Sequence, residues 1–180
     1  MKLTFDDGPG ADTTRLLEVL AEGGVKASFF MVGNRVKTLP DVAAKVAAGG
    51  HTVGNHSVTH PHLPDLDLNN VRTELSGCSR IIKEATGVMP VRWRAPYGSS
   101  TPAIAHVAEQ LGMMYQERWD VDPRDWEGPP SADTIFGRVV DGVEVSRESD
   151  PVVLLHDGPQ LRSNTVKAVE RLLAEGLVAG

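Results

Sequence analysis

Short apolar runs alternate with amphipathic segments along the whole chain, and this alternation constrains the fold more than any other feature. Strands are expected at the start of the chain and at residues 26–32, 51–55, 91–94, 113–119 and 152–155. Helices are expected between and after them, at residues 13–22, from 40 to the glycines at 49–50, and at 68–85, 101–111, 132–140 and 165–174. This order predicts an α/β fold with a parallel sheet.

The length of the chain narrows the choice of architecture. With 180 residues, a single domain over residues 1–180 with a sizeable core is expected. A regular barrel of eight strands and eight helices needs roughly 200–250 residues, and only about six strands are expected here. A distorted, incomplete (β/α) barrel with parallel strands therefore fits best, and a doubly wound open sheet is the alternative. The last residues, 176–180, give no clear closing strand.

Composition excludes several classes of protein. Hydrophobic residues make up 41% of the chain and charged residues 23%, as in ordinary globular proteins. The net charge of −6 argues against a nucleic-acid partner, and no apolar run approaches the ~18–20 residues of a membrane span. One cysteine, Cys78, excludes an internal disulfide and a cysteine-rich zinc site.

Ionisable residues follow five of the expected strands. In a parallel barrel the C-terminal ends of all strands open on one face, where active sites are built. The sequence therefore predicts that one mouth of the barrel gathers these residues: Asp6 and Asp7, His56 and His60, Arg94 to Tyr97, Asp122 with Asp125 and Trp126, and His156 with Asp157.

Two adjacent carboxylates end the first strand, in the stretch MKLTFDDGP. Gly8 and Pro9 stop regular structure directly after them. Successive side chains of a strand point to opposite sides, so Asp6 and Asp7 can serve two partners, one a metal ion and the other a proton. By itself the stretch also fits a plain turn, because Asp, Gly and Pro are common turn residues.

His56 and His60 stand four residues apart, a spacing that lets one turn present both imidazoles to a single metal ion. Pro61 disfavours helix at His60, so a turn is expected there rather than a long helix. With Asp6 or Asp7 they would form a His₂-carboxylate set, which suits Zn²⁺ with a position open for water. Two exposed surface histidines are the alternative.

The carboxylate that does not bind metal can act as general base on water. Arg94 could hold this base through a bidentate ion pair, and a purely structural salt bridge would look the same in sequence. Pro96 shapes the loop that follows, where the backbone N–H of Tyr97 could stabilise an oxyanion.

His156 ends a strand and could act as general acid, with Asp122 or Asp125 raising its pKa and fixing its tautomer. A buried structural histidine is the competing interpretation. Trp126 and Leu154 could wall a small apolar pocket. A metal, a base, an acid, an oxyanion donor and such a pocket are what hydrolysis of a small acyl amide or ester requires.

Five stretches of this chain, in this order, resemble the motifs of the polysaccharide deacetylase (NodB-homology) family, carbohydrate esterase family four. They are Thr4-Phe5-Asp6-Asp7-Gly8-Pro9, His56-Ser57-Val58-Thr59-His60, Arg94-Ala95-Pro96-Tyr97, Asp122-Pro123-Arg124-Asp125-Trp126 and Leu154-Leu155-His156-Asp157. The resemblance spans nearly the whole chain. It implies a distorted (β/α) barrel, a single catalytic domain and metal-dependent removal of acetyl groups from sugars.

The resemblance also implies a role for each site residue. Asp6 would be the base that deprotonates a metal-activated water, supported by Arg94. The metal ligands would be Asp7, His56 and His60, with Zn²⁺ as the first choice and Co²⁺ or another divalent ion as alternatives.

On the opposite side His156 would be the acid, tuned by Asp125. Tyr97 would offer its backbone amide to the substrate, and Trp126 and Leu154 would enclose the acetyl methyl group.

We expect the partner to be a polysaccharide, first of all an N-acetylglucosamine polymer such as chitin oligomers or peptidoglycan, with Trp119 and Trp126 available to stack on sugar rings. Acetylxylan, with O-acetyl groups, is the close alternative. A small-amide hydrolase and a non-enzymatic carbohydrate-binding module are further alternatives. By analogy with the family, a secreted or cell-wall-associated monomer is expected, although no signal peptide is evident in the chain.

Overall fold

In the part of the chain that the structure describes, six parallel strands form one strongly curved sheet. The structure is a computed structural model of the whole chain and describes residues 1–128 and 130–178. The sheet runs in the order β5-β4-β3-β2-β1-β6, and every pairing is parallel. Its strands are β1 (Lys2–Asp6), β2 (Ser28–Met31), β3 (Thr52–Asn55), β4 (Arg92–Trp93), β5 (Tyr115–Gln116) and β6 (Val152–His156).

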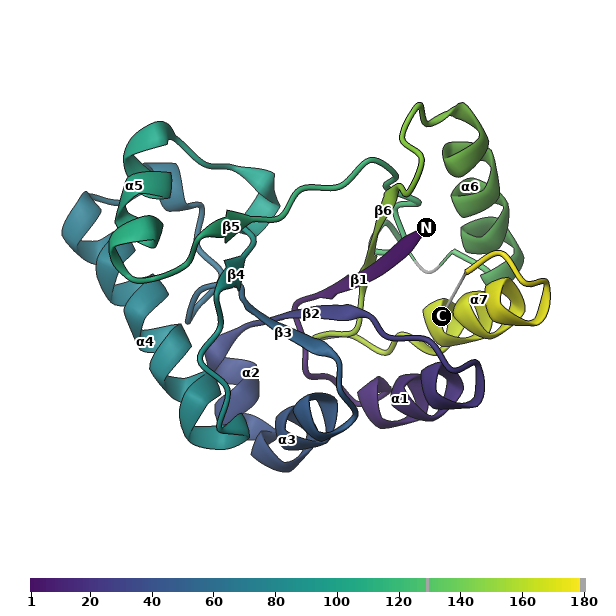
Figure 1. Cartoon of the computed structure of the whole chain (residues 1–180), viewed down its shortest axis with the longest axis horizontal. Coiled ribbons are helices and arrows are strands. Elements are labelled where there is room, and N and C mark those ends of the chain that lie inside the picture. Colours follow the sequence, from purple (N-terminus) through teal and green to yellow (C-terminus); the bar gives the residue numbers. More distant parts are fainter. Residues whose placement is uncertain (129, 179–180) are drawn as a thin grey trace.

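The barrel is left incomplete between β5 and β6. Within the described residues these two edge strands do not pair, and the chain after β5 crosses the gap instead (Figure 1). This crossing segment reaches β6 at Val121, which forms an isolated parallel bridge to Val153. The prediction of a distorted, incomplete (β/α) barrel is therefore confirmed, because the parallel sheet curls and its helices lie around the outside (Figure 1). A doubly wound open sheet, the alternative, carries helices on both faces.

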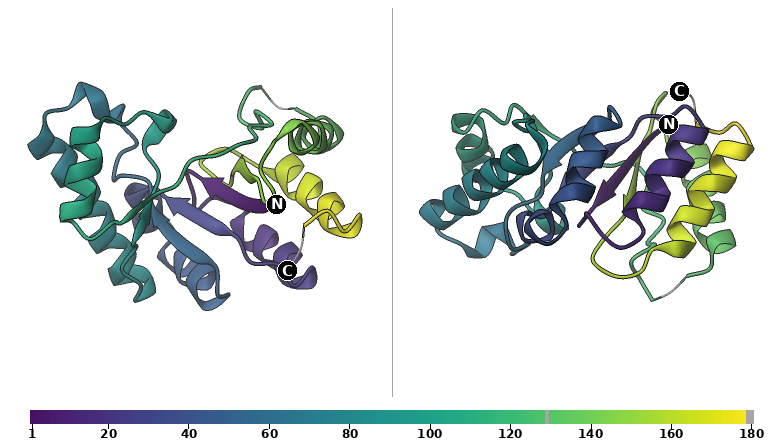
Figure 2. Two further views of the ribbon diagram at one scale, coloured as in Figure 1. Left: turned by 45° about the horizontal axis from the view of Figure 1, so that its top comes forward. Right: turned by 90° about the horizontal axis from the view of Figure 1, so that it is seen from below.

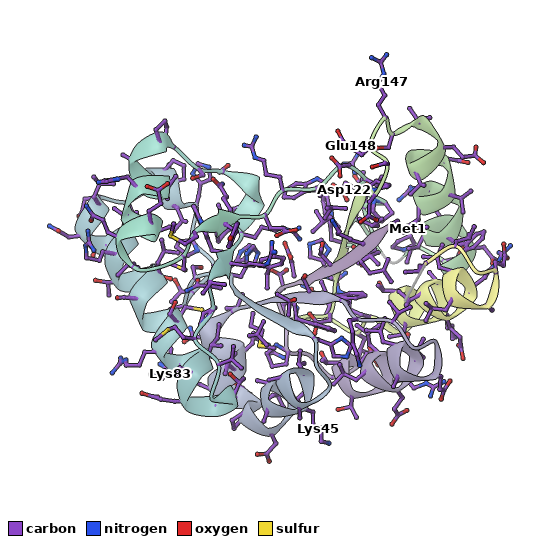
Figure 3. The ribbon with its side chains drawn as sticks, in the orientation of Figure 1. Met1, Lys45, Lys83, Asp122, Arg147 and Glu148 are labelled. Atoms are coloured by element: carbon purple, nitrogen blue, oxygen red, sulfur yellow. The ribbon has the colours of Figure 1, made fainter. Side chains whose placement is uncertain are left out.

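The described residues form seven α-helices, which lie around the outside of this curved sheet (Figure 2). They are α1 (Thr13–Glu22), α2 (Gly33–Thr38), α3 (Pro40–Ala48), α4 (Leu68–Thr86), α5 (Pro102–Gln110), α6 (Ala132–Val145) and α7 (Ser163–Ala174), with short 3₁₀ turns at Leu63–Asp65 and Pro96–Gly98. Charged side chains such as Lys45 and Lys83 point outward from these helices (Figure 3). None of the helices in the described part of the chain is long and apolar enough to span a bilayer.

Side chains alternate between the helices and the barrel interior along β1. Leu3 and Phe5 are buried in the main apolar core, where burial of each side chain contributes about 1.5–3 kcal/mol. Thr4 and Asp6 point to the inner side and contact Arg94 there. A second apolar core, around Trp93, lies under α4 and α5. The alternation fixes which side chains of each strand can reach the mouth.

Three details differ from the sequence-based expectation. The strand expected at 113–119 is paired only at Tyr115–Gln116, because its one neighbour, β4, is itself only two residues long. The helix expected at 132–140 continues to Val145. The short helix α2 was not expected, since its six residues, GNRVKT, are too few to show an amphipathic period.

Candidate active site

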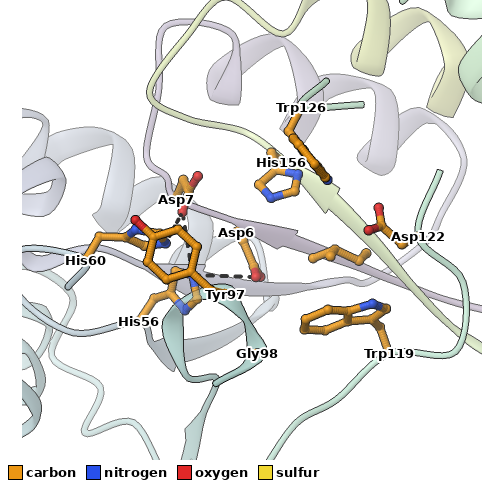
Figure 4. Close-up of a pocket in the computed structure, with 11 residues that line it drawn as sticks. Asp6, Asp7, His56, His60, Tyr97, Gly98, Trp119, Asp122, Trp126 and His156 are labelled. Atoms are coloured by element: carbon orange, nitrogen blue, oxygen red, sulfur yellow. Dashed lines mark ion pairs between the residues drawn. The ribbon is translucent and has the colours of Figure 1, made fainter. Parts of the chain in front are cut away.

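The C-terminal ends of the strands surround a cavity of about 380 Å³. Figure 4 shows Asp7, His56 and His60 on one side of it, His156 and Trp126 on the other, and Asp6 between them. The lining residues come from strand ends and loops far apart in the chain and comprise Asp6, Asp7, His56, His60, Tyr97, Gly98, Trp119, Asp122, Trp126, Leu154 and His156.

Asp7, His56 and His60 point their polar atoms at a common position. One possible ligand atom from each lies within 4.8 Å of those of the other two. The Asp7 Oδ1 atom is 3.1 Å from His60 Nε2 and 3.5 Å from His56 Nε2. Asp7 Oδ1 is nevertheless buried and makes no hydrogen bond within the described residues. A buried oxygen of this kind, beside two ring nitrogens, fits a divalent metal with a position open to the cavity.

The tautomer of His56 also fits metal binding. Its Nδ1 lies 2.7 Å from the carbonyl oxygen of Arg94, which can only accept a hydrogen bond. Nδ1 therefore carries the proton, and the lone pair of Nε2 points toward Asp7. Such a second hydrogen bond fixes the orientation of a ligating imidazole.

Electrostatics keep Asp7 in the charged form that a metal requires. Burial by itself raises the pKa of the Asp7 carboxyl, but the His56 and His60 rings beside it outweigh burial and hold this pKa well below its usual range. Burial lowers the pKa of His56, whereas Asp6 and Asp7 raise it, with a net increase. A proton and a metal ion would thus compete for binding at Asp7 and His56.

A left-handed backbone gives these ligands their directions. Asp7, His60 and Tyr97 have φ values of 69°, 60° and 59°, a conformation that costs roughly 1–2 kcal/mol per residue outside glycine. Strained residues of this kind cluster at functional sites. The strand ends at Asp6, so Asp6 and Asp7 separate through this turn and not, as expected, through strand alternation. The turn expected at His60 is confirmed.

Asp6 is buried against Arg94 on the inner side of the sheet. Arg94 Nη1 donates to Asp6 Oδ1 and to Thr4 Oγ1, both at 2.8 Å. Its Nε and Nη2 donate to the carbonyl oxygens of Glu117 and Arg118. The expected bidentate pair is therefore wrong: a single nitrogen of Arg94 serves Asp6, because the others hold the segment after β5.

His156 and Asp125 form the second charged pair of the site. His156 Nδ1 donates to Asp125 Oδ1 at 2.7 Å, and the backbone N–H of His156 donates to Asp125 Oδ2 at 3.0 Å. Burial lowers the pKa of His156, but Asp125, Asp6 and Asp7 raise it above its ordinary value. Asp122 does not take part, since its carboxylate accepts from the backbone N–H of Arg124.

Aromatic and aliphatic side chains form the walls of the cavity. Leu154 is buried, whereas Tyr97 and Trp126 are well exposed at the rim. The ring of Tyr97 stands edge-on to that of His60, with centroids 4.7 Å apart. The apolar pocket expected from Trp126 and Leu154 is thus present, and Trp119 extends its wall.

The structure brings all ten sequence-predicted site residues to this mouth. Eight line the cavity, and Arg94 and Asp125 lie directly behind Asp6 and His156. Sequence reasoning missed two buried hydroxyl groups. Thr4 accepts from Arg94, and Thr165 donates to Asp125 at 2.8 Å. Thr4 could have been found, because it lies two residues before Asp6 on the same strand face; no sequence signal connects Thr165 with Asp125.

Comparison with known proteins identifies the family. A family model described as Polysaccharide deacetylase matches residues 1–116. A chitooligosaccharide deacetylase from Rhizobium leguminosarum bv. trifolii is 38% identical over 157 residues, which is 87% of this chain and 70% of that protein. A peptidoglycan-N-acetylglucosamine deacetylase from Bacillus cereus is 36% identical over 77% of this chain and 50% of its own length.

Two further relatives widen the range of activities and support the fold. A bifunctional xylanase/xylan deacetylase from Cellvibrio japonicus is 31% identical over 99% of this chain and 26% of its own length. The family 4 carbohydrate esterase from Streptomyces lividans, solved in complex with acetate, superposes with a TM-score of 0.85 and 33% identity over 97% of this chain and 85% of that one. The chain therefore belongs to the polysaccharide deacetylase family of hydrolases, carbohydrate esterase family 4.

Proposed function

We propose that this chain is a single catalytic domain that removes N-acetyl groups from N-acetylglucosamine polymers, either chitin oligomers or peptidoglycan. One observation carries the proposal: a triad fit for a metal and two ion pairs, Asp6 with Arg94 and His156 with Asp125, surround one cavity. The relatives named chitooligosaccharide and peptidoglycan-N-acetylglucosamine deacetylases support this choice of substrate.

A divalent metal, with Zn²⁺ as first choice and Co²⁺ as an alternative, would be held by Asp7, His56 and His60. Once bound, it would lower the pKa of a water molecule and polarise the acetyl carbonyl group. The Arg94 carbonyl holds a proton on Nδ1 of His56, so Nε2 is the ring nitrogen that would bind the metal once it is deprotonated.

Asp6 is proposed as the general base. Its Oδ1 is engaged by Arg94, and its other oxygen, Oδ2, lies 3.6 Å from His56 Nε2, on the side of the metal triad. Oδ2 is thus the atom placed to take a proton from water attacking the acetyl carbon. The cation of Arg94 compensates the buried charge of Asp6 before the proton arrives.

His156 is proposed as the general acid that protonates the leaving nitrogen. Its Nδ1 proton is committed to Asp125, so Nε2 is the atom that would deliver a proton into the cavity. The raised pKa of His156 keeps it protonated further toward neutral pH than an ordinary histidine. The backbone N–H of Tyr97 would stabilise the developing oxyanion, and the acetyl methyl group would contact Leu154 and Trp126.

O-acetyl xylan is the second candidate substrate, because a xylan deacetylase is among the relatives. An amine is a poorer leaving group than an alkoxide, and the strongly held His156–Asp125 pair therefore favours the amide. A small free amide would leave the exposed side chains of Tyr97 and Trp126 at the rim without a contact, which argues against a small-amide hydrolase. A module that only binds carbohydrate needs no base, and the buried Asp6–Arg94 pair argues against it.

The test is a screen of acetate release from chitin oligomers, peptidoglycan and acetylxylan, each with and without a chelator. We expect release from an N-acetylglucosamine polymer, lost with chelator and restored by Zn²⁺ or Co²⁺. Release from acetylxylan alone would favour the second candidate, and chelator-resistant release would contradict the metal. Peptidoglycan lies in the cell wall, so we also propose a secreted or cell-wall location, and a protein that acts as a monomer.

A further inference from the structure

Two identical tripeptides lie side by side at the ends of neighbouring strands. β1 runs into Asp7-Gly8-Pro9 and β6 into Asp157-Gly158-Pro159. The strands pair in register, with Asp6 opposite His156, and the backbone N–H of Asp157 donates to the carbonyl oxygen of Asp6 at 3.0 Å. One turn carries the proposed metal ligand Asp7; the carboxyl group of Asp157 in the other has no part in the proposed chemistry.

The two turns pack against each other without room for a side chain between them. A Cβ atom placed on Gly8 would lie 2.2 Å from Asp157 Oδ1. A Cβ atom placed on Gly158 would lie 2.5 Å from the carbonyl oxygen of Asp7. The Asp157 carboxyl group therefore rests on the backbone of Gly8, one residue after the metal ligand, and Gly158 rests on Asp7 itself.

A hydrogen-bonded chain ties this carboxyl group to the loop that follows. Thr13 Oγ1 donates to Asp157 Oδ2 at 2.6 Å and accepts from the backbone N–H of Gly10 at 2.8 Å. The carboxyl group thus contacts the Asp7–Thr13 loop at both ends, through Gly8 and through Thr13. Movement of the loop would break packing at one end or a hydrogen bond at the other.

Burial of a carboxyl group here is costly and calls for a physical reason. Asp157 is only 2% exposed, and its Oδ1 has no hydrogen-bond partner within the described residues. Burial raises the pKa of Asp157 to about 7, with Thr13 opposing this effect and Asp7 and Asp6 adding to it. An unpaired buried polar atom costs about 1–3 kcal/mol, which an apolar side chain would avoid.

We propose that Asp157 is a positioning residue for Asp7: it locks the loop after β1 so that the Asp7 carboxylate stays aimed at His56 and His60. The left-handed backbone of Asp7, with φ of 69°, persists only if its surroundings hold it. Gly158 and Asp157 supply that hold from the neighbouring strand. The inference rests on the proposed function, because it assumes that Asp7, His56 and His60 bind a metal.

The test measures Zn²⁺ affinity by competition with a chromophoric chelator, together with the thermal unfolding midpoint. We expect Asp157→Ala to weaken Zn²⁺ binding about 10–100-fold, the range typical of groups that support metal ligands. Asp157→Asn should bind Zn²⁺ nearly as the wild type, because an amide of the same shape still packs on Gly8 and accepts from Thr13. The matched control is Asp150→Asn, at the opposite end of β6, where Asp150 pairs with Lys2.

Wild-type Zn²⁺ affinity in Asp157→Ala, with a lower unfolding midpoint, would show a merely structural residue and overturn the inference. Equal losses in the alanine and asparagine variants would also overturn it, since shape and hydrogen bonding would not then explain the effect. If Asp157→Ala fails to fold, Thr13→Val decides, with weakened affinity expected and unchanged affinity contradicting the inference. Absence of Zn²⁺ binding by the wild type would instead refute the proposed metal site.

Discussion

The two sides of the cavity carry ion pairs of opposite polarity. The side of the proposed base Asp6 is called the base side, and that of the proposed acid His156 the acid side. On the base side, the carboxylate Asp6 is compensated by the cation Arg94, which directly follows β4 and reaches Asp6 across the barrel interior. On the acid side, the imidazole of His156 is compensated by the carboxylate Asp125 from the crossing loop. In each pair the group nearer the substrate is oriented by an oppositely charged group behind it.

The two sides differ in what holds the supporting group. Arg94 is held by strand β1 and by carbonyl oxygens after β5, so the base side is part of the sheet. Asp125 is held by Thr165 in the first turn of α7, and Arg162 donates to its carbonyl oxygen. The acid side therefore depends on a loop and a helix start. This difference implies that the two halves can be weakened independently.

The largest effect is expected from Asp6→Asn. The amide cannot accept a proton from water, so turnover should fall on the order of 10²–10⁴-fold on amide and ester substrates alike. The metal content should be unchanged, because Asp7, His56 and His60 remain. Acetate release and metal analysis on the same sample check both statements; turnover that survives would remove Asp6 from the role of base.

His156→Ala should have the next largest effect and should separate the two sides by substrate. An amine leaves poorly without a proton, so loss on an N-acetyl substrate should reach about 100-fold or more and exceed the loss on an O-acetyl substrate. The ratio of kcat/KM values for the two substrates measures this. The matched control is His106→Ala, at an exposed position. Equal losses on both substrates in His156→Ala would mean that His156 has a structural role.

Asp125→Asn should change the pH dependence. Asp125 raises the pKa of His156, and a raised pKa keeps the acid protonated, hence active, up to a higher pH. Without that carboxylate the alkaline limb of kcat/KM should move to lower pH, by about 1–3 units. A limb that stays in place would assign the alkaline titration to another group.

The smallest effects, and the sharpest comparison, are expected from removing one hydroxyl group on each side. Thr4→Val deletes two buried hydrogen bonds, one from Arg94 and one to the carbonyl oxygen of Val153, and Thr165→Val deletes the one to Asp125. A bond that supports a charged pair is worth about 1 kcal/mol, or roughly fivefold in rate. Thr4→Val should lower amide and ester turnover equally, whereas Thr165→Val should lower amide turnover more. Thr4→Ser and Thr165→Ser should restore activity; identical substrate profiles for the two valine variants would mean that the sides are not independent.

Sequence reasoning located the site because its residues follow strand ends, and parallel strands end on the same face. Reasoning from the residues alone left Asp122 and Asp125 open, since both lie in one loop, and only the family resemblance named Asp125; the fold shows that Asp125 is the one that reaches His156. It expected two nitrogens of Arg94 on Asp6, because the carbonyl oxygens of Glu117 and Arg118 that take the others are more than twenty residues away.

The amino-acid sequence alone determined the α/β class, the parallel strands and the ionisable residues at the strand ends. These features depend on periodicity and on turn residues, which act over a few positions. Only the tertiary structure decided how the barrel stays open between β5 and β6 and which hydroxyl groups support the charged pairs. It also decided that Asp157 rests on the turn of Asp7, 150 residues away in sequence, because such contacts depend on which strands become neighbours.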